Sequence, residues 1–351
     1  MKLLIITQRV DIEDDNLGFF HQWIEKLALK VDKICVICLW EGKHNLPDNV
    51  SVYSLGKEKG FSRLRRLLRL QILLLANLPE SDGIFIHMCP IYAIASFPLA
   101  KIFSKKMILW FLHRSVNWKL ISAERCVDRI LTASEESCRL KNRKKIKIVG
   151  HGIDTELFKA RNPESIIQNS KFKILSVGRI SPIKDQQTLI EAIDILVNQK
   201  NIKDIEVKII GSPLEESETK YFEQLKKMKE NRGLNNYIEF LGSVSYAKLP
   251  AYYQEADLSV NLSHTGSIDK VVLEAMASGC SVLTCNEAFQ NILDLKYLFN
   301  KKDPLDLAEK IINLREAKED KNLRDIVVKN YNLDALTDKI ILEFNVLNKR
   351  I

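Results

Sequence analysis

The 351-residue sequence predicts two α/β domains, each built on a doubly wound parallel sheet with helices on both faces. Apolar β-rich runs alternate with helical patterns almost from end to end, which is typical of strands buried on both faces. The length exceeds what one hydrophobic core usually supports. The alternation breaks once, in a polar stretch between Asp154 and Lys171, and we place an interdomain linker there.

The first half contains six predicted strands before this linker. They cover residues 3–7, 34–40, 83–88, 107–112, 129–133 and 146–149. Helical patterns separate most of them, so they predict a first Rossmann-like domain over residues 1–160.

The second half contains five more predicted strands. They cover residues 172–177, 207–211, 238–242, 258–263 and 281–285 and predict a second Rossmann-like domain over residues 165–333. Residues 334–351 have apolar side chains at helical spacing, among them Leu336, Ile340 and Phe344, and no strand follows them. This segment therefore predicts a terminal helix that packs on another surface.

Positive charge is concentrated in the first half of the chain. Residues 1–160 carry 26 Lys and Arg against 17 Asp and Glu, whereas residues 161–351 carry 27 against 28. The two basic clusters, residues 57–69 and 139–147, have three open interpretations: a surface for anionic lipid, a surface for nucleic acid, or a solvated surface. In the first cluster, leucines and arginines share one helix, which is typical either of an interfacial amphipathic helix or of a cationic helix packed on the sheet.

The sequence contains no segment that we predict to be a signal peptide or a membrane span. The apolar start of the chain is too short for a signal peptide and is typical of a first strand. The stretches 67–78 and 83–100 are interrupted by polar residues or prolines. Seven scattered cysteines indicate free thiols. We therefore expect a cytoplasmic protein, with peripheral attachment at the inner face of the membrane as the open alternative.

The residues that follow the strands of the second half are candidates for a binding site, since ligands of open parallel sheets lie beyond the carboxyl ends of the strands. Arg179 and Lys184 follow the strand 172–177, and their two charges would suit a diphosphate whose negative charge grows as a glycosidic bond to it breaks. Gly211 and Gly242 end two further strands and allow a flat ligand, such as a nucleobase, to approach the backbone.

The segment HTGSIDK, residues 264–270, opens a helix after the strand 258–263. A helix N-terminus directs backbone N–H groups toward anions. Glu274 lies about one turn inside this helix, where its carboxylate either accepts hydrogen bonds from vicinal hydroxyls, such as those of a ribose, or favours the helix dipole.

These motifs together, G-R-x-x-x-x-K at 178–184 and L-E-A-M-A-S-G at 273–279, resemble the retaining glycosyltransferases of family 4. The resemblance implies the GT-B fold, in which two Rossmann-like domains face each other and the last helix crosses back to the first. It also implies that the first domain binds the acceptor and the second binds a nucleotide sugar. Arg179 and Lys184 would then hold the donor diphosphate and Glu274 the ribose.

The chain departs from the family pattern at Gly266, where the family usually has a glutamate that binds hydroxyls of the donor sugar. Asp269, Lys270 or backbone groups of the loop are candidates to replace it. His113, after the strand 107–112, matches the histidine that the family places beside the reacting sugar, so we predict His113, Arg179, Lys184 and Glu274 as catalytic. The predicted substrate-binding residues are Gly18, Gly178, Gly211, Gly242, Ser243, Val244, Thr265, Gly266, Ser267, Asp269, Lys270 and Val271.

The predicted function is transfer of a sugar, with retained anomeric configuration, from a nucleoside diphosphate sugar to the hydroxyl of a sugar or lipid-linked acceptor, in the synthesis of cell-envelope polysaccharide or glycolipid. The resemblance implies a front-face route without an enzymic nucleophile and without a metal or other cofactor. We expect no nucleic-acid partner, because the basic clusters lack interleaved aromatic residues apart from Phe61.

Two other enzyme classes remain as alternatives. One is an enzyme of the same fold with another reaction, a nucleotide-sugar epimerase or a phosphorylase. The other is a dinucleotide-dependent oxidoreductase, because IKIVGHGIDT (146–155) nearly matches a G-x-G-x-x-G fingerprint after a strand.

Overall fold

The computed structural model describes residues 1–161, 171–317 and 322–349. These residues divide into two compact units. The first comprises residues 1–152, 245–247 and those from 333 onward, and the second comprises 153–244 and 248–332. Most of the predicted linker falls in residues 162–170, outside the described residues.

The N-terminal segment of the first unit ends at Gly152, whereas the sequence placed the end of the first domain at residue 160. The hydrogen bonds explain the difference. The Ile153 N–H donates to the Tyr331 carbonyl at 2.7 Å, and Ile153 forms a parallel bridge with Asn332. The chain therefore joins the second unit at Ile153.

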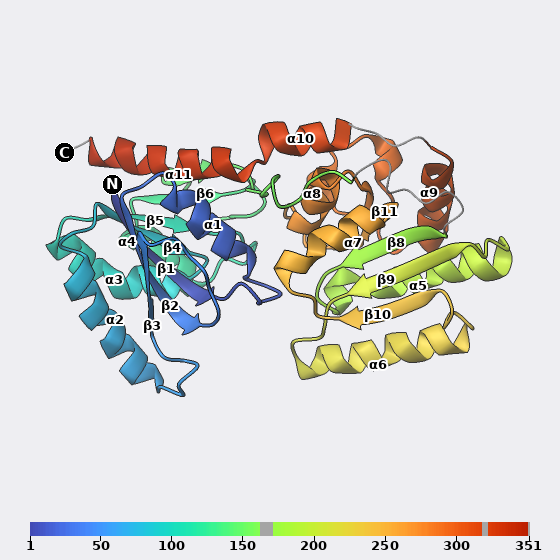
Figure 1. The fold of residues 1–351 in the computed structure, drawn as a ribbon, viewed down its shortest axis with the longest axis horizontal. Helices are drawn as coiled ribbons and strands as arrows, with labels where there is room; N and C mark the ends of the chain where they lie inside the picture. Colours follow the sequence, from blue (N-terminus) through green and yellow to red (C-terminus); the bar gives the residue numbers. More distant parts are fainter. Residues whose placement is uncertain (162–170, 318–321, 350–351) are drawn as a thin grey trace. The chain divides into compact units, whose positions relative to one another are not determined.

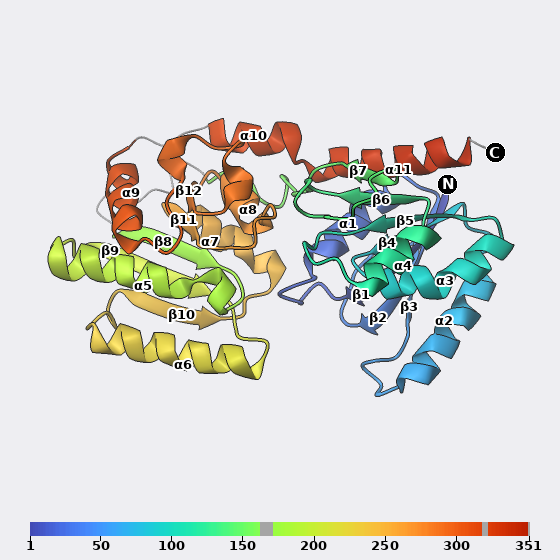
Figure 2. The same ribbon diagram turned by 180° about the vertical axis from the view of Figure 1, so that it is seen from behind.

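The first unit has a seven-stranded parallel sheet (Figures 1 and 2). Its strand order is β3-β2-β1-β4-β5-β6-β7, a doubly wound order that reverses between β1 and β4. The elements are β1 (Lys2–Val10), α1 (Phe19–Ala28), β2 (Lys33–Glu41), β3 (Val50–Ser54), α2 (Arg63–Asn77), β4 (Gly83–His87), α3 (Pro90–Ile102), β5 (Lys106–Trp110), α4 (Trp118–Cys126), β6 (Arg129–Thr132), β7 (Ile146–Ile148) and α11 (Leu333–Asn348).

All six strands predicted in the first half are present, and the sequence missed β3. This strand lies at the sheet edge and pairs only with β2. Its residues, VSVYS, are mostly half-buried and alternate between apolar and polar types, so they do not stand out as an apolar run.

Helices cover both faces of the first sheet. Apolar side chains of α1 and α11, such as Trp23 and Phe344, form one core with the sheet, whereas those of α2, α3 and α4, such as Leu74 and Leu120, form the other. The predicted terminal helix is α11, and its buried Glu343 pairs with Arg129 and Lys147 of the last two strands. These ion pairs join α11 to the sheet of the first unit.

The second unit has a five-stranded parallel sheet of order β10-β9-β8-β11-β12, which reverses between β8 and β11. All five strands predicted in this half are present. The elements are β8 (Phe172–Val177), α5 (Gln186–Asp194), a π-helical turn (Ile195–Gln199), β9 (Ile205–Ile210), α6 (Glu216–Asn231), β10 (Ile238–Gly242), α7 (Leu249–Glu255), β11 (Leu258–Asn261), α8 (Lys270–Ala277), β12 (Ser281–Thr284), α9 (Pro304–Glu316) and α10 (Asn322–Asn330), with short 3-10 turns at Pro182–Lys184, Glu287–Phe289 and Leu295–Tyr297. A further 3-10 turn, Tyr246–Lys248, begins in the 245–247 segment of the first unit.

The prediction of two doubly wound α/β sheets is therefore confirmed for each unit. All seven cysteines are free thiols, also as predicted. Among the described residues, no helix is long and apolar enough to cross a membrane.

Candidate functional site

Three glycines form the carboxyl edge of neighbouring strands in the second sheet. Gly178, Gly211 and Gly242 lie at the ends of β8, β9 and β10 and all have positive φ. Their backbones are linked, since the Gly211 N–H donates to the Gly242 carbonyl at 2.8 Å. A Cβ added to Gly211 would lie 1.9 Å from the Gly178 carbonyl oxygen. Only glycine fits at position 211, and the edge has no side chains at these three positions.

Lys184 lies beside this edge, at the point where the strand order reverses. Its aliphatic chain passes Gly178, and its ammonium group donates to Ser263 Oγ at 3.0 Å and to Asp269 Oδ1 at 2.8 Å. Lys184 follows β8, whereas Ser263 and Asp269 follow β11. The ion pair therefore spans the topological switch point, where open α/β sheets bind their ligands.

Asn286 holds the other side of Asp269. The Asn286 Nδ2 group donates to Asp269 Oδ2 at 2.8 Å and to the Ser267 carbonyl at 2.7 Å. Asn286 itself is buried and its backbone N–H donates to Thr284 Oγ1. The loop before α8 is thus bound to the end of β12. The sequence reasoning missed Asn286, although it follows a predicted strand almost directly, as the chosen candidates do.

Gly266, in the same loop, has φ +64°. This left-handed conformation disfavours a side chain with a Cβ. The glycine that stands here in place of the family's glutamate therefore suits the backbone conformation of this loop. A glutamate at position 266 would be strained unless the loop changed its backbone conformation.

Arg179 follows β8 as predicted, but its side chain points toward α6. Its Nε lies 3.2 Å from Glu218 Oε1, and the other Glu218 oxygen accepts from the backbone N–H groups of Leu214 and Glu215. The Arg179 side chain remains 39% exposed. Glu218 therefore orients Arg179 from the start of α6. The sequence reasoning missed Glu218. The spacing of Glu215 and Glu218 at the start of α6 is that of a capping box and could have indicated it.

Glu274 lies inside α8 and is only 1% exposed. The hydroxyl of Tyr253, from α7, donates to Glu274 Oε2 at 3.4 Å, and Lys270 Nζ lies 3.9 Å from Oε1. Burial raises the pKa of Tyr253 well above its usual range, so this hydroxyl stays a donor. Burial also lowers the pKa of Lys270 to about 8, an effect that the Glu274 charge partly offsets. The sequence reasoning predicted Glu274 and Lys270 but missed Tyr253.

The remaining predicted residues of the second unit lie on the same edge. Ser243 and Val244 follow β10, and Thr265 bonds to Ser263 through their hydroxyl oxygens at 3.0 Å. Val271 is half-buried in the first turn of α8. The structure therefore brings the predicted residues of this unit to the carboxyl ends of β8, β9, β10 and β11.

His113 and Gly18 belong to the first unit. His113 follows β5 and is exposed, and its Nδ1 accepts a hydrogen bond from the Ser115 N–H at 3.1 Å. Gly18 precedes α1, where an added Cβ would lie 2.3 Å from the Asp14 carbonyl oxygen. Glycine is therefore needed at position 18 because the chain itself passes close by. Roles for both residues in substrate binding stay predictions.

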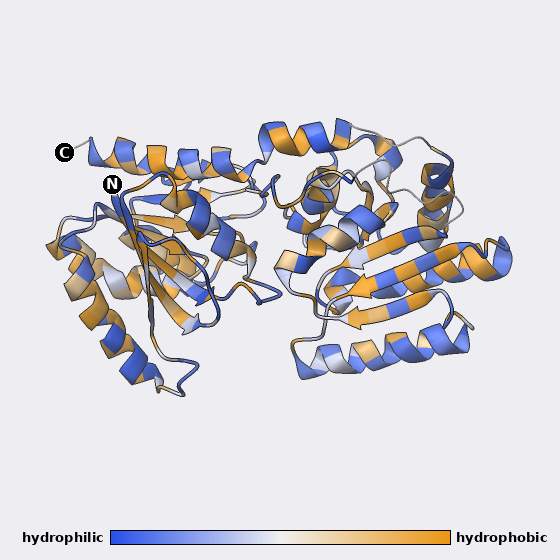
Figure 3. Ribbon diagram, viewed as in Figure 1, coloured by the Kyte–Doolittle hydropathy of each residue, from blue (hydrophilic) through white to orange (hydrophobic). Residues whose placement is uncertain are grey.

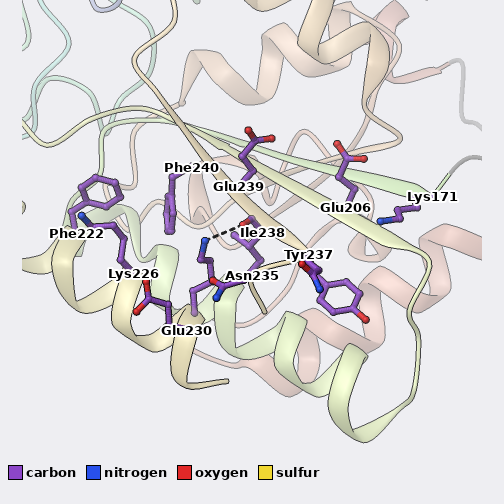
Figure 4. Close-up of a pocket in the computed structure, with 12 residues that line it drawn as sticks. Lys171, Glu206, Phe222, Lys226, Glu230, Asn235, Tyr237, Ile238, Glu239 and Phe240 are labelled. Atoms are coloured by element: carbon purple, nitrogen blue, oxygen red, sulfur yellow. Dashed lines mark hydrogen bonds between the residues drawn. The ribbon is translucent and has the colours of Figure 1, made fainter. Parts of the chain in front are cut away.

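A hollow of about 630 Å³ lies elsewhere on the second unit (Figure 4). Its lining includes Phe222 and Lys226 of α6 and Glu239 and Phe240 of the edge strand β10. None of the predicted site residues lines it. It is therefore separate from the glycine-lined edge.

Two local features bear on the alternative chemistries. Residues 149–161, after β7, contain no helix, so the near match to a dinucleotide fingerprint lacks the helix that such a motif opens. The near match at residues 146–155 therefore does not support the oxidoreductase interpretation. Within residues 1–161, 171–317 and 322–349, no group of three or more His, Cys, Asp or Glu side chains is arranged to hold a metal ion.

Comparison with known proteins finds glycosyl transferases, and the match to a family model lies almost entirely in the second unit. Residues 158–334, half of the chain, match the family described as "Glycosyl transferases group 1". The chain is 31% identical over 106 residues to the mannosylfructose-phosphate synthase of Agrobacterium fabrum, covering 30% of this chain and 23% of that protein. It is 25% identical over 221 residues to the alpha-monoglucosyldiacylglycerol synthase of Streptococcus pneumoniae, covering 60% and 49%. The matched segments thus span less than half of these relatives' lengths.

Solved structures resemble the whole chain in fold. Anabaena HepE in complex with UDP-glucose has a TM-score of 0.78 at 19% identity, covering 99% of this chain and 100% of that one. Sucrose-phosphate synthase from Thermosynechococcus elongatus has a TM-score of 0.76 at 16% identity, covering 100% of both. The predicted GT-B fold is confirmed by these likenesses. The match of the family model to half of the chain shows that this protein belongs to the group 1 glycosyl transferases and is similar to family 4.

Proposed function

We propose that this protein transfers a sugar from a nucleoside diphosphate sugar to a hydroxyl acceptor, and that the second unit binds the donor. The observation that carries this proposal is the meeting of Lys184 with the glycine-lined edge at the switch point. Because the three glycines have no side chains, a flat nucleobase can approach the backbone at this edge. A lysine beside a helix N-terminus can bind phosphate. Structural neighbours include a protein solved with UDP and with UDP-glucose.

The roles of the individual residues follow from their positions. Lys184 and the exposed part of Arg179 would bind the diphosphate and stabilise its growing charge when the glycosidic bond breaks. Glu274, oriented by Tyr253, would accept hydrogen bonds from ribose hydroxyls. Its burial favours this role, because a charge-assisted hydrogen bond is stronger when water is excluded. His113 would act beside the transferred sugar.

Three finer features also belong to the proposal. We expect a sugar or lipid-linked acceptor in the synthesis of envelope polysaccharide or glycolipid, since one relative is named as a synthase of a glucosylated diacylglycerol. We expect retention of anomeric configuration, as the family 4 resemblance implies. We expect no metal requirement, so turnover should persist in the presence of EDTA.

A ligand screen tests donor binding. A ligand that binds only the folded protein raises its stability, by about 2.7 kcal/mol when its concentration is 100 times its Kd. We expect one of UDP, GDP and ADP, and its sugar derivatives, to raise the melting temperature. Lys184→Ala should abolish the shift. Lys208→Ala is the matched control. Lys208 also forms ion pairs, with Glu206 and Glu255, but it lies within β9 and not after the end of a strand.

Product analysis then separates transfer from the epimerase alternative. Mass spectrometry of a reaction with the bound donor and a mixture of acceptors should show a sugar joined to a new acceptor. Release of an isomerised nucleotide sugar or sugar without such a product would contradict the proposal.

A further inference from the structure

Helix α2 of the first unit has two apolar faces. Leu70 and Leu74 are buried in the core beneath the sheet, whereas Leu64 and Ile72 are 67% and 65% exposed. At about 100° per residue, positions 64, 68, 72 and 75 fall within an arc of about 80° that points away from the buried pair. All four of these residues, and the adjoining Leu67, are large aliphatic side chains that the structure leaves exposed.

The charges along this helix have one sign. Between Glu58 and Glu80 the chain contains no acidic residue and four arginines. Arg63 and Arg65 are exposed near the start of the helix, and the Arg65 guanidinium lies 3.5 Å from the centre of the Phe61 ring. Figure 3 shows hydrophilic residues in the N-terminal half of α2 and mostly hydrophobic residues toward its C-terminal end.

The two neighbouring helices extend this surface. Helices α2, α3 and α4 cover the same face of the sheet, and Gln71 of α2 donates to the Ala95 carbonyl of α3 at 3.1 Å. In a doubly wound sheet each helix begins at the carboxyl ends of the strands. The first turns of the three helices carry the exposed residues Leu64, Ile91 and Trp118, the last of them 64% exposed. Apolar side chains therefore occur on the outer face of α2 and at the start of its neighbours.

We propose that this α2 surface, defined as Leu64, Leu67, Leu68, Ile72 and Leu75 with Arg63 and Arg65, docks on an anionic lipid bilayer. The helix would lie in the plane of the interface with its outer leucines among the acyl chains and its arginines at the headgroups. Trp118 would lie at headgroup depth, where tryptophan is favoured. Five exposed aliphatic side chains on one helix argue against the interpretation of residues 57–69 as a merely solvated basic surface.

Charge favours a bilayer over a second copy of the chain. A two-fold contact through α2 would bring the same arginines of both copies together, with no acid in this segment to neutralise them. An anionic membrane supplies both an apolar layer and the opposite charge. The proposal goes beyond the enzymatic function and does not depend on it, because docking needs neither donor nor acceptor.

Flotation with lipid vesicles tests the proposal on the full-length protein. We expect binding to vesicles that contain phosphatidylglycerol and little binding to pure phosphatidylcholine, with weakening at high salt. The triple variant Leu64→Glu, Leu68→Glu, Ile72→Glu should reduce the bound fraction at least about tenfold. The matched control is Leu214→Glu, Leu295→Glu, Leu305→Glu, three exposed leucines of the second unit.

Melting curves and light scattering complete the test. Both triple variants should melt within a few degrees of the parent, because the substituted side chains are exposed. If the α2 triple variant melts much lower, the single Arg63→Gln variant replaces it and should also bind anionic vesicles less than the parent. The proposal is overturned if the parent protein does not float with anionic vesicles, or if the folded α2 variant floats as well as the control. It is also overturned if the parent is a dimer that the α2 substitutions convert to a monomer.

Discussion

Lys184 Nζ donates to Asp269 Oδ1 at 2.8 Å, across the point where the second sheet reverses its strand order. The cation that we assign to the donor diphosphate therefore already has a carboxylate partner, and Asn286 holds that carboxylate from its other oxygen. A diphosphate that binds here must share or displace Asp269. The same carboxylate is a candidate for the sugar hydroxyls that the family's glutamate binds elsewhere.

Replacing Asp269 separates these two roles. Asp269→Asn removes the charge that competes with phosphate, so affinity for the nucleoside diphosphate should stay equal or increase. Affinity for the intact nucleotide sugar should fall about tenfold relative to the diphosphate, since a charge-assisted hydrogen bond contributes about 1.5 kcal/mol or more. Titration calorimetry with both ligands measures the ratio. An unchanged ratio, or an unchanged donor KM in Asp269→Ala, would remove Asp269 from sugar binding. Asp194→Asn is the control, because Asp194 also forms an ion pair, with Arg232 at the C-terminal end of α6.

The Tyr253 hydroxyl should matter for donor binding through Glu274. Tyr253→Phe keeps the buried ring but removes the donor to a buried carboxylate, which costs about 1.5–3 kcal/mol. We expect a lower melting temperature and a donor Kd about tenfold higher. The neighbouring Tyr252→Phe is the control, because Tyr252 is half-buried on the same helix. Equal donor affinity in the two variants would show that Tyr253 does not orient Glu274.

Gly211 should tolerate no side chain. In Gly211→Ala the new methyl group would meet the Gly178 carbonyl at 1.9 Å with φ at +139°, so the edge must distort. We expect the free energy of unfolding to fall by about 3 kcal/mol or more. Gly233→Ala is the matched control, since Gly233 also has positive φ but no atom within 4 Å of the added Cβ. Its cost should be about 1 kcal/mol. Urea unfolding of both variants measures the difference, and similar values would contradict the close packing of the edge.

Lys270 should make stability depend on pH above neutrality. Burial lowers its pKa to about 8 in the folded state, whereas an unfolded lysine titrates near 10.4. Between these values the unfolded chain binds more protons, so stability rises with pH through this window. Relative to Lys270→Met, the parent should gain about 2–3 kcal/mol from pH 8 to about pH 10. Parallel unfolding free energies of the two proteins across this range would show that Lys270 is not desolvated.

The sequence located eleven of the strands because each contains an apolar run, and most of these strands are buried on both faces, although the edge strands β7 and β10 are mostly half-buried or exposed. It missed β3, whose mostly half-buried edge position does not demand such a run. The rule that ligands bind beyond strand ends pointed to Lys184 and Gly211, and the structure places both at the carboxyl end of the second sheet. It did not show that Arg179 turns toward Glu218, because that contact depends on where α6 begins in space.

The sequence by itself determined the family, the two sheets and the residues at their carboxyl ends, because hydrophobic periodicity and glycine positions are local properties of the chain. The tertiary structure decided which side chains meet there. Lys184 and Asp269 are 85 positions apart, and Tyr253 and Glu274 are 21 apart. Such pairs form only when separate strands and helices pack together, so no local pattern encodes them. Packing also decided that α2 buries one leucine face and leaves the other exposed, which the alternation of leucines and arginines left open.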